Sequence, residues 1–109
     1  MTDAERIDIE RLEHIIPYGK ENAISRAELA RQMNMPDRAM RKAVQIARTE
    51  GLLILNDGHG NGYYFSDNAE DLRRQLERTH RRALALLAQE KWLRRQITKV
   101  ILGQTEMEI

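Results

Sequence analysis

The feature that most constrains this chain is the stretch from Ala69 to Leu102, which contains neither glycine nor proline and therefore favours one long helix. Asp67-Asn-Ala-Glu70 precedes it as a start that resembles a capping box, and Gly103 is expected to end it. At about 1.5 Å per residue this helix is roughly 50 Å long, far longer than the body of so small a domain. The sequence therefore predicts a small globular domain followed by a long C-terminal helix.

The composition restricts the kind of protein and its location. The chain has 109 residues, which fits one domain and leaves little room for a large catalytic cavity between lobes. It has no cysteine, which excludes disulfides and thiolate-bound metals and favours a reducing compartment. The start of the chain is acidic and polar, unlike a secretory signal, and no uncharged apolar run approaches the roughly 20 residues of a membrane span. We expect a cytoplasmic protein without a membrane segment.

The net charge of +1 conceals a strong segregation of charge along the chain. Lys and Arg outnumber Asp and Glu by 6 to 3 in residues 26–50 and by 9 to 2 in residues 72–103. Residues 51–71 instead hold 4 acidic residues and no Lys or Arg. A polyanion contacts one face of a protein rather than its average charge, so this distribution is compatible with nucleic-acid binding. The alternative is that each basic run is simply a solvated helix face.

Two short helices are predicted in the first third of the chain. The first ends before Pro17, and its expected apolar stripe consists of Ile7, Ile9, Leu12, Ile15 and Ile16. The second is expected to begin at Ser25 or Arg26 and to run to about Met33. Its start is indicated by Ser25-Arg-Ala-Glu28, because in a capping box the serine accepts a backbone N–H and the glutamate reaches back to the cap.

A third helix is expected from Pro36 to Gly51, after a tight turn at Asn34. Its predicted buried residues are Met40, Ala43, Val44 and Ala47. Beyond Gly51, the runs Leu52–Leu55 and Tyr63–Phe65 are typical of two short strands joined by a glycine-rich tip. Together these segments predict two helices joined by a turn and followed by a β-hairpin.

This order of elements predicts a mostly α fold with a small β-hairpin, arranged as a winged helix-turn-helix. The small Ala30 falls where the two helices of the motif cross, and Asn34 tolerates the positive φ of the turn. We expect the winged helix-turn-helix domain to span residues 1–66 and the long helix to span residues 67–103. Residues 104–109 are expected to form a tail.

Three segments of the sequence resemble segments of a known protein family. They are Ile16-Pro-Tyr-Gly-Lys-Glu-Asn-Ala-Ile-Ser-Arg-Ala-Glu-Leu-Ala30, Asp37-Arg-x-x-Arg41, and Gly62-Tyr-Tyr-Phe65, with an Arg-rich helix after the last. Over residues 15–97 the chain resembles small phage- and prophage-encoded winged helix-turn-helix DNA-binding proteins. The resemblance implies DNA binding in phage replication or gene control, in the cytoplasm of a bacterial host cell. It also implies other phage replication or regulatory proteins as further partners.

In this fold the second helix of the motif enters the major groove of DNA, and its first residues reach base edges. The candidate base-contacting residues are Asp37, Arg38, Arg41, Lys42 and Gln45, and the candidate phosphate-contacting residues are Ser25, Arg26 and Arg48. Arg pairs bidentately with guanine and Gln with adenine, so the chemistry for reading double-stranded DNA is present. The alternative is that these residues only keep an exposed helix soluble. His59 and Asn61 at the hairpin tip are weaker candidates, because the tip has no Lys or Arg and Asp57 repels phosphate.

The long helix carries apolar residues at alternating spacings of 4 and 3, which indicates a coiled-coil seam. The candidate dimerisation residues are Leu76, Ala83, Leu86, Leu87, Leu93 and Ile97. Residues 83–88 are apolar nearly all round the helix, which implies burial on more than one side. We predict a homodimer that binds a roughly palindromic DNA site. The alternative is a helix that folds back on its own domain.

The sequence gives little support for a catalytic function. His14, His59 and His80 lie in different predicted elements and lack the spacing of metal ligands. The Gly58-x-Gly60-x-Gly62 segment lacks the lysine of a phosphate-binding loop and precedes a strand rather than a helix. We expect a binding protein that is not an enzyme and that uses no metal or cofactor. The alternative function is a protein–protein adaptor of a phage replication or packaging complex built on the same scaffold.

Overall fold

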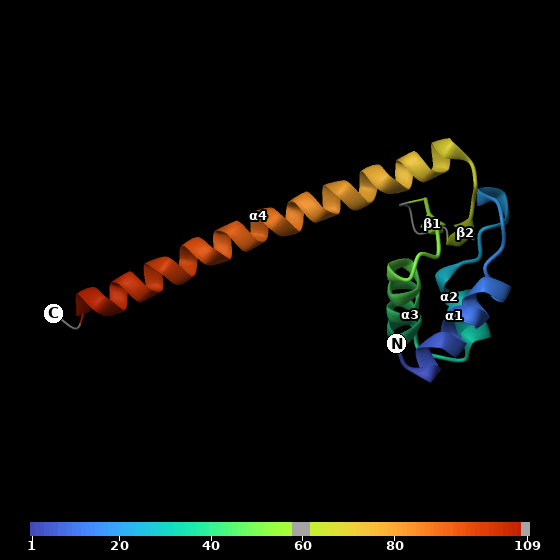
Figure 1. Cartoon of the computed structure of the whole chain (residues 1–109), viewed down its shortest axis with the longest axis horizontal. Coiled ribbons are helices and arrows are strands. Elements are labelled where there is room, and N and C mark those ends of the chain that lie inside the picture. Colours follow the sequence, from blue (N-terminus) through green and yellow to red (C-terminus); the bar gives the residue numbers. More distant parts are fainter. Residues whose placement is uncertain (58–61, 108–109) are drawn as a thin grey trace. The chain divides into compact units, whose positions relative to one another are not determined.

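The computed structural model describes residues 1–57 and 62–107, and the chain divides into two compact units, Met1–Gln75 and Leu76–Ile109. The elements are α1 (Asp3–Ile15), a 3-10 turn η1 (Lys20–Asn22), α2 (Arg26–Met33), α3 (Asp37–Thr49), β1 (Ile54–Asn56), β2 (Tyr63–Phe65) and α4 (Ala69–Met107) (Figure 1). The described chain is mostly helical with a small two-stranded antiparallel sheet. The predicted class of helices plus a β-hairpin is therefore confirmed.

The first three helices surround one apolar core in the N-terminal unit. Its side chains are Ile9, Leu12, Ile16, Leu29, Ala30, Met33, Met40, Ala43, Val44, Ala47, Ile54, Tyr63 and Phe65. All four residues predicted to be buried on α3 belong to it. On α1 the expected stripe is only partly right, because Ile7 is 55% exposed. Ile7 lies two residues before Ile9, which places it about 200° away around the helix.

Local backbone chemistry ends α2 and α3 where the sequence predicts. Asn34 adopts the left-handed conformation, with φ of 54°, and the N–H of Met35 then donates to the carbonyl of Ala30 at 3.1 Å. Gly51 has a φ of 97°, and the N–H of Leu52 donates to the carbonyl of Ala47 at 3.0 Å. These bonds satisfy carbonyls that the last turn of a helix would otherwise leave unpaired.

The helix α4 begins at Ala69 as expected, but its capping residue differs from the expected one. The N-cap is Asn68 rather than Asp67, because its Oδ1 accepts the N–H of Glu70 at 2.9 Å and that of Asp71 at 3.3 Å. Ser66 fixes this choice: its hydroxyl accepts the N–H of Asn68 at 3.0 Å and donates to the carboxylate of Asp71 at 2.9 Å. This pair of bonds orders the chain so that Asn68 enters the cap position.

The expected end of α4 at Gly103 is wrong, since the helix continues to Met107. Gly103 is not among the glycines with positive φ, so it does not make the left-handed turn by which glycine ends a helix. A single glycine inside a helix costs only about 1 kcal/mol relative to alanine, which a long helix tolerates. Most of the expected tail is thus helical as far as Met107. Within the described ranges, none of the helices combines the length and apolar character needed to span a membrane.

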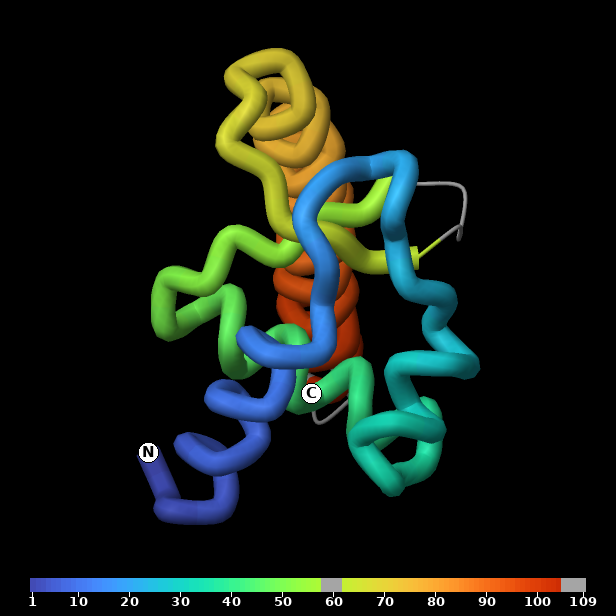
Figure 2. Tube along the Cα trace, turned by 90° about the vertical axis from the view of Figure 1, so that its right-hand side faces the viewer, coloured from blue at the N-terminus to red at the C-terminus, as the bar shows by residue number. Residues whose placement is uncertain are grey.

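The hairpin pairs Leu55 with Tyr64 in antiparallel register, and the connection between α1 and α2 runs along its other side. Ile24 and Tyr63 exchange two backbone hydrogen bonds of 2.9 and 2.8 Å, and Figure 2 shows this light-blue connection beside the hairpin. The outer edge of β1 is also occupied, because the Asn56 N–H donates to the side chain of Gln75 at 3.1 Å. His59 and Asn61, the weaker candidates for DNA contact at the hairpin tip, lie outside the described residues.

Candidate nucleic-acid interface

The helix α3 has two chemically different sides. Its apolar residues face the core, and its polar residues on the opposite side are exposed: Arg38, Arg41, Lys42 and Gln45. Arg38 lies three and four residues before Arg41 and Lys42, and Gln45 lies four and three residues after them, so the side chains follow one stripe along the helix. The structure therefore brings together four of the five residues predicted to contact bases.

Asp37, the fifth, is the first residue of α3 and forms two ion pairs. Its Oδ1 lies 2.9 Å from the Nε of Arg26, and its Oδ2 lies 2.9 Å from the Nε of Arg41. The two arginine side chains are 56% and 53% exposed, so these pairs sit at the surface. The first residue of α2 and the exposed side of α3 are thereby joined through one carboxylate.

Arg38, Lys42 and Gln45 differ from these paired arginines. Within residues 1–57 and 62–107, their side chains have no hydrogen-bond or ion-pair partner, and all three are exposed. Arg38 and Lys42 are cations, and the Gln45 amide is both a donor and an acceptor. The exposed side of α3 thus presents one arginine fork, one ammonium group and one amide to the solvent.

Ser25 performs the capping role that the sequence predicts, but Glu28 does not. The Oγ of Ser25 accepts the N–H of Glu28 at 3.1 Å. The Glu28 carboxylate turns away from the cap and pairs with Arg31, whose Nε lies 2.9 Å away, and with the Gln32 amide, also at 2.9 Å. The hydrogen bond from Arg31, and then that from Gln32, lowers the pKa of Glu28 to about 2. The negative charge of Glu28 is therefore paired with side chains of α2 itself.

Arg48 occupies a different environment from the other predicted contacts. Its Nε donates to the carbonyl of Ile54 at 2.8 Å, and its guanidinium lies 5.9 Å from the centre of the Tyr63 ring. The side chain is half-buried and links the end of α3 to the edge of β1. Because this position serves the fold, we leave Arg48 out of the interface proposed below.

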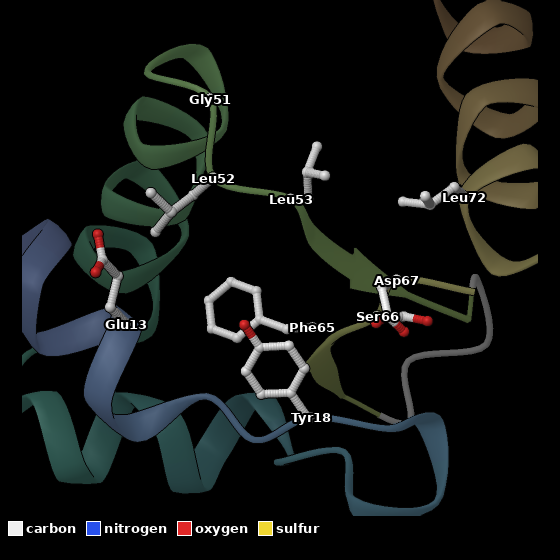
Figure 3. Close-up of a pocket in the computed structure, with 9 residues that line it drawn as sticks. All are labelled: Glu13, Tyr18, Gly51, Leu52, Leu53, Phe65, Ser66, Asp67 and Leu72. Carbon is white, nitrogen blue, oxygen red and sulfur yellow. The ribbon is translucent and has the colours of Figure 1, made fainter. Parts of the chain in front are cut away.

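A groove of about 500 Å³ lies elsewhere on the N-terminal unit. It is lined by Glu13, Tyr18, Gly51, Leu52, Leu53, Phe65, Ser66, Asp67 and Leu72 (Figure 3). The Tyr18 and Phe65 rings are 5.4 Å apart, and Tyr18 is 71% exposed. Apolar side chains dominate the lining, which suits contact with another apolar surface better than acid–base chemistry. Nowhere in the described residues do three or more His, Cys, Asp or Glu side chains gather as metal ligands.

Sequence reasoning identified the exposed residues of α3 but missed the two ion pairs that Asp37 forms with Arg26 and Arg41. The spacing of Asp37 and Arg41, four residues apart in one helix, is a signal for the second ion pair. The pair between Arg26 and Asp37 crosses the turn and has no such local signal. Comparison with known proteins finds no family model, no curated protein and no solved structure that matches this chain.

Proposed function

We propose that this chain binds double-stranded DNA and places the exposed side of α3 in the major groove. On this proposal α2 and α3 form a helix-turn-helix, and β1 and β2 form the wing of a winged helix. The observation that carries it is the stripe on α3, where Arg38, Lys42 and Gln45 have no side-chain partner in the described chain and accompany the paired Arg41. The order of the elements and the sharp turn at Asn34 also support this fold.

The stripe supplies the chemistry that sequence readout of DNA requires. An arginine such as Arg38 donates two hydrogen bonds to the O6 and N7 of guanine, and Gln45 pairs similarly with adenine. Lys42, predicted from the sequence to contact bases, is a point charge that also suits a phosphate. Ser25 and Arg26 lie at the start of α2, where phosphates are often held. We propose a phage-type transcriptional regulator or replication-associated DNA binder, acting in the cytoplasm of a bacterial host cell without cofactor.

We further propose that α4 makes the protein a homodimer. Its candidate dimerisation residues include Leu76, Leu86, Leu87, Leu93 and Ile97, and the exposed fraction of each lies between 58% and 67%. So many exposed large apolar side chains on one helix favour burial against a partner helix. A dimer would present two copies of α3 to two half-sites, which predicts an operator with inverted symmetry.

DNA binding is tested by fluorescence anisotropy with random and selected duplexes at several salt concentrations. We expect Lys42→Ala to reduce the slope of log affinity against log salt by about 0.9, the value for one lost phosphate contact. We expect Arg38→Ala to weaken binding to the selected sequence by about 1–3 kcal/mol. Arg6→Ala on α1 removes the same charge outside the interface and serves as the matched control. Wild-type protein without salt-dependent binding to any duplex would overturn the proposal.

The homodimer is tested by sedimentation equilibrium. Leu86→Asp places a charge in the proposed seam and is expected to convert the dimer to a monomer, because an unpaired charge in an apolar interface costs several kcal/mol. Thr98→Asp introduces the same charge at an exposed polar position of α4, outside both the seam and the apolar segment of residues 83–88, and is expected to leave the dimer intact. A monomeric wild-type protein, or equal effects of the two variants, would contradict the seam.

A protein–protein adaptor is the second candidate function, favoured by the exposed apolar side chains rather than by α3. Tyr18 and Leu53, which is 60% exposed, line the groove of the N-terminal unit, and Trp92 on α4 is 66% exposed. Exposed aromatic and leucine side chains are common at protein interfaces. A gel-shift with random duplex at low salt separates the two functions, because an adaptor would show no salt-dependent retention of DNA.

A further inference from the structure

The carboxylate of Asp37 stands in an unusual place for a DNA-binding surface. It is the first residue of α3, its side chain is 41% exposed, and a phosphate brought near it would be repelled. In the structure both of its oxygens are engaged, one with Arg26 and the other with Arg41, at 2.9 Å each. Two guanidinium charges thus surround one carboxylate, and the cluster as a whole is positive.

The geometry of these pairs leaves most of each arginine available. In both cases the ion pair is made by the Nε atom of the guanidinium. A guanidinium has five N–H donors, and within the described residues the four on its two terminal nitrogens form no hydrogen bond with Asp37. Those terminal nitrogens can form the two-pronged contact that recognises guanine or grips a phosphate.

We propose that Asp37 determines specificity by holding Arg26 and Arg41 in one fixed orientation; this inference rests on the proposed DNA binding. A free arginine side chain must lose rotamer freedom when it binds, and it adapts to many ligand positions. An arginine already held at its Nε loses less freedom in the correct complex and cannot follow a wrongly placed base. Asp37 is therefore a positioning residue that lowers affinity for DNA in general and favours the matching sequence.

The decisive variant is Asp37→Asn, which keeps the size of the side chain and removes its charge. We expect its affinity for random duplex to rise, because a repulsive charge is lost and two arginines are released. We expect the ratio of specific to random affinity to fall about tenfold, which is within the discrimination of one bidentate arginine contact. The specific sequence is the one selected by the wild-type protein from a random duplex pool, and circular dichroism checks that the variant folds.

Glu50→Gln is the matched control, because Glu50 directly follows α3 and its removal changes the net charge by the same amount. It is expected to leave the specificity ratio unchanged. In a double-mutant cycle, Asp37→Asn is expected to have little further effect on the ratio once Arg41 is alanine. A wild-type protein that binds DNA and an Asp37→Asn variant with an unchanged ratio would overturn this inference alone. Absence of DNA binding by the wild-type protein would instead overturn the proposed function.

Discussion

Replacing Gly62 with alanine is expected to lower the free energy of unfolding by about 2–4 kcal/mol, through backbone strain and lost hydrogen bonds. Gly62 has a φ of 123°, which side chains rarely allow. An added Cβ would lie 2.1 Å from the carbonyl oxygen of Ile24 and 2.6 Å from its carbon, and both are backbone atoms. Because Ile24 and Tyr63 exchange two hydrogen bonds at this point, the chains cannot separate without losing them.

Urea unfolding followed by far-UV circular dichroism measures this effect, and Gly51→Ala supplies the control. Gly51 also has positive φ, at 97°, but an added Cβ would meet no atom within 4 Å. Gly51→Ala is therefore expected to cost only the conformational strain, about 1–2 kcal/mol. If the two variants lost the same stability, the close approach of Gly62 to Ile24 would not be the constraint that we infer.

The parts of the fold that the sequence predicts well are those decided by local chemistry. Asn34 and Gly51 end their helices because few other residues adopt positive φ, and such a signal is visible in a single residue. The buried side of α3 is equally local, since Met40 and Ala47 repeat at the helical period. The folded chain keeps these locally favoured conformations because its tertiary packing is compatible with them.

The differences arise where a local pattern has more than one outcome. Asp67 and Asn68 are both good helix caps, and only the bonds of Ser66 with Asn68 and Asp71 decide between them. Gly103 either ends a helix or is carried within it, and the surrounding helix formers favour the second outcome.

The candidate interface also contains features that the sequence alone predicts and features that it does not. Exposure of Arg38 and Lys42 follows from the helical period, so sequence alone predicts it. The hydrogen bond from the Nε of Arg48 to the carbonyl of Ile54 depends instead on β1 lying against the end of α3. The link from Arg26 to Asp37 likewise depends on how the turn places α2 against α3. Such pairings between elements require the folded chain.

Replacing Met40 with alanine is expected to lower the free energy of unfolding by about 2–5 kcal/mol, the range for truncating a fully buried methionine. Met40 is 0% exposed and belongs to the same core as Leu12 and Leu29, which are also fully buried. Truncation removes apolar contacts and leaves a cavity among three helices that cannot fully close. The same urea unfolding experiment gives the loss directly.

Two variants separate this core role from the proposed role of the opposite side of α3. Met40→Leu conserves most of the volume and is expected to cost less than about 1.5 kcal/mol while retaining DNA affinity. Arg38→Ala, two residues away on the exposed side, is expected to change stability by no more than about 0.5 kcal/mol while weakening DNA binding. If Arg38→Ala destabilised the fold as much as Met40→Ala, the arginine would serve the packing of the domain. The division of α3 into a buried side and a binding side would then be wrong.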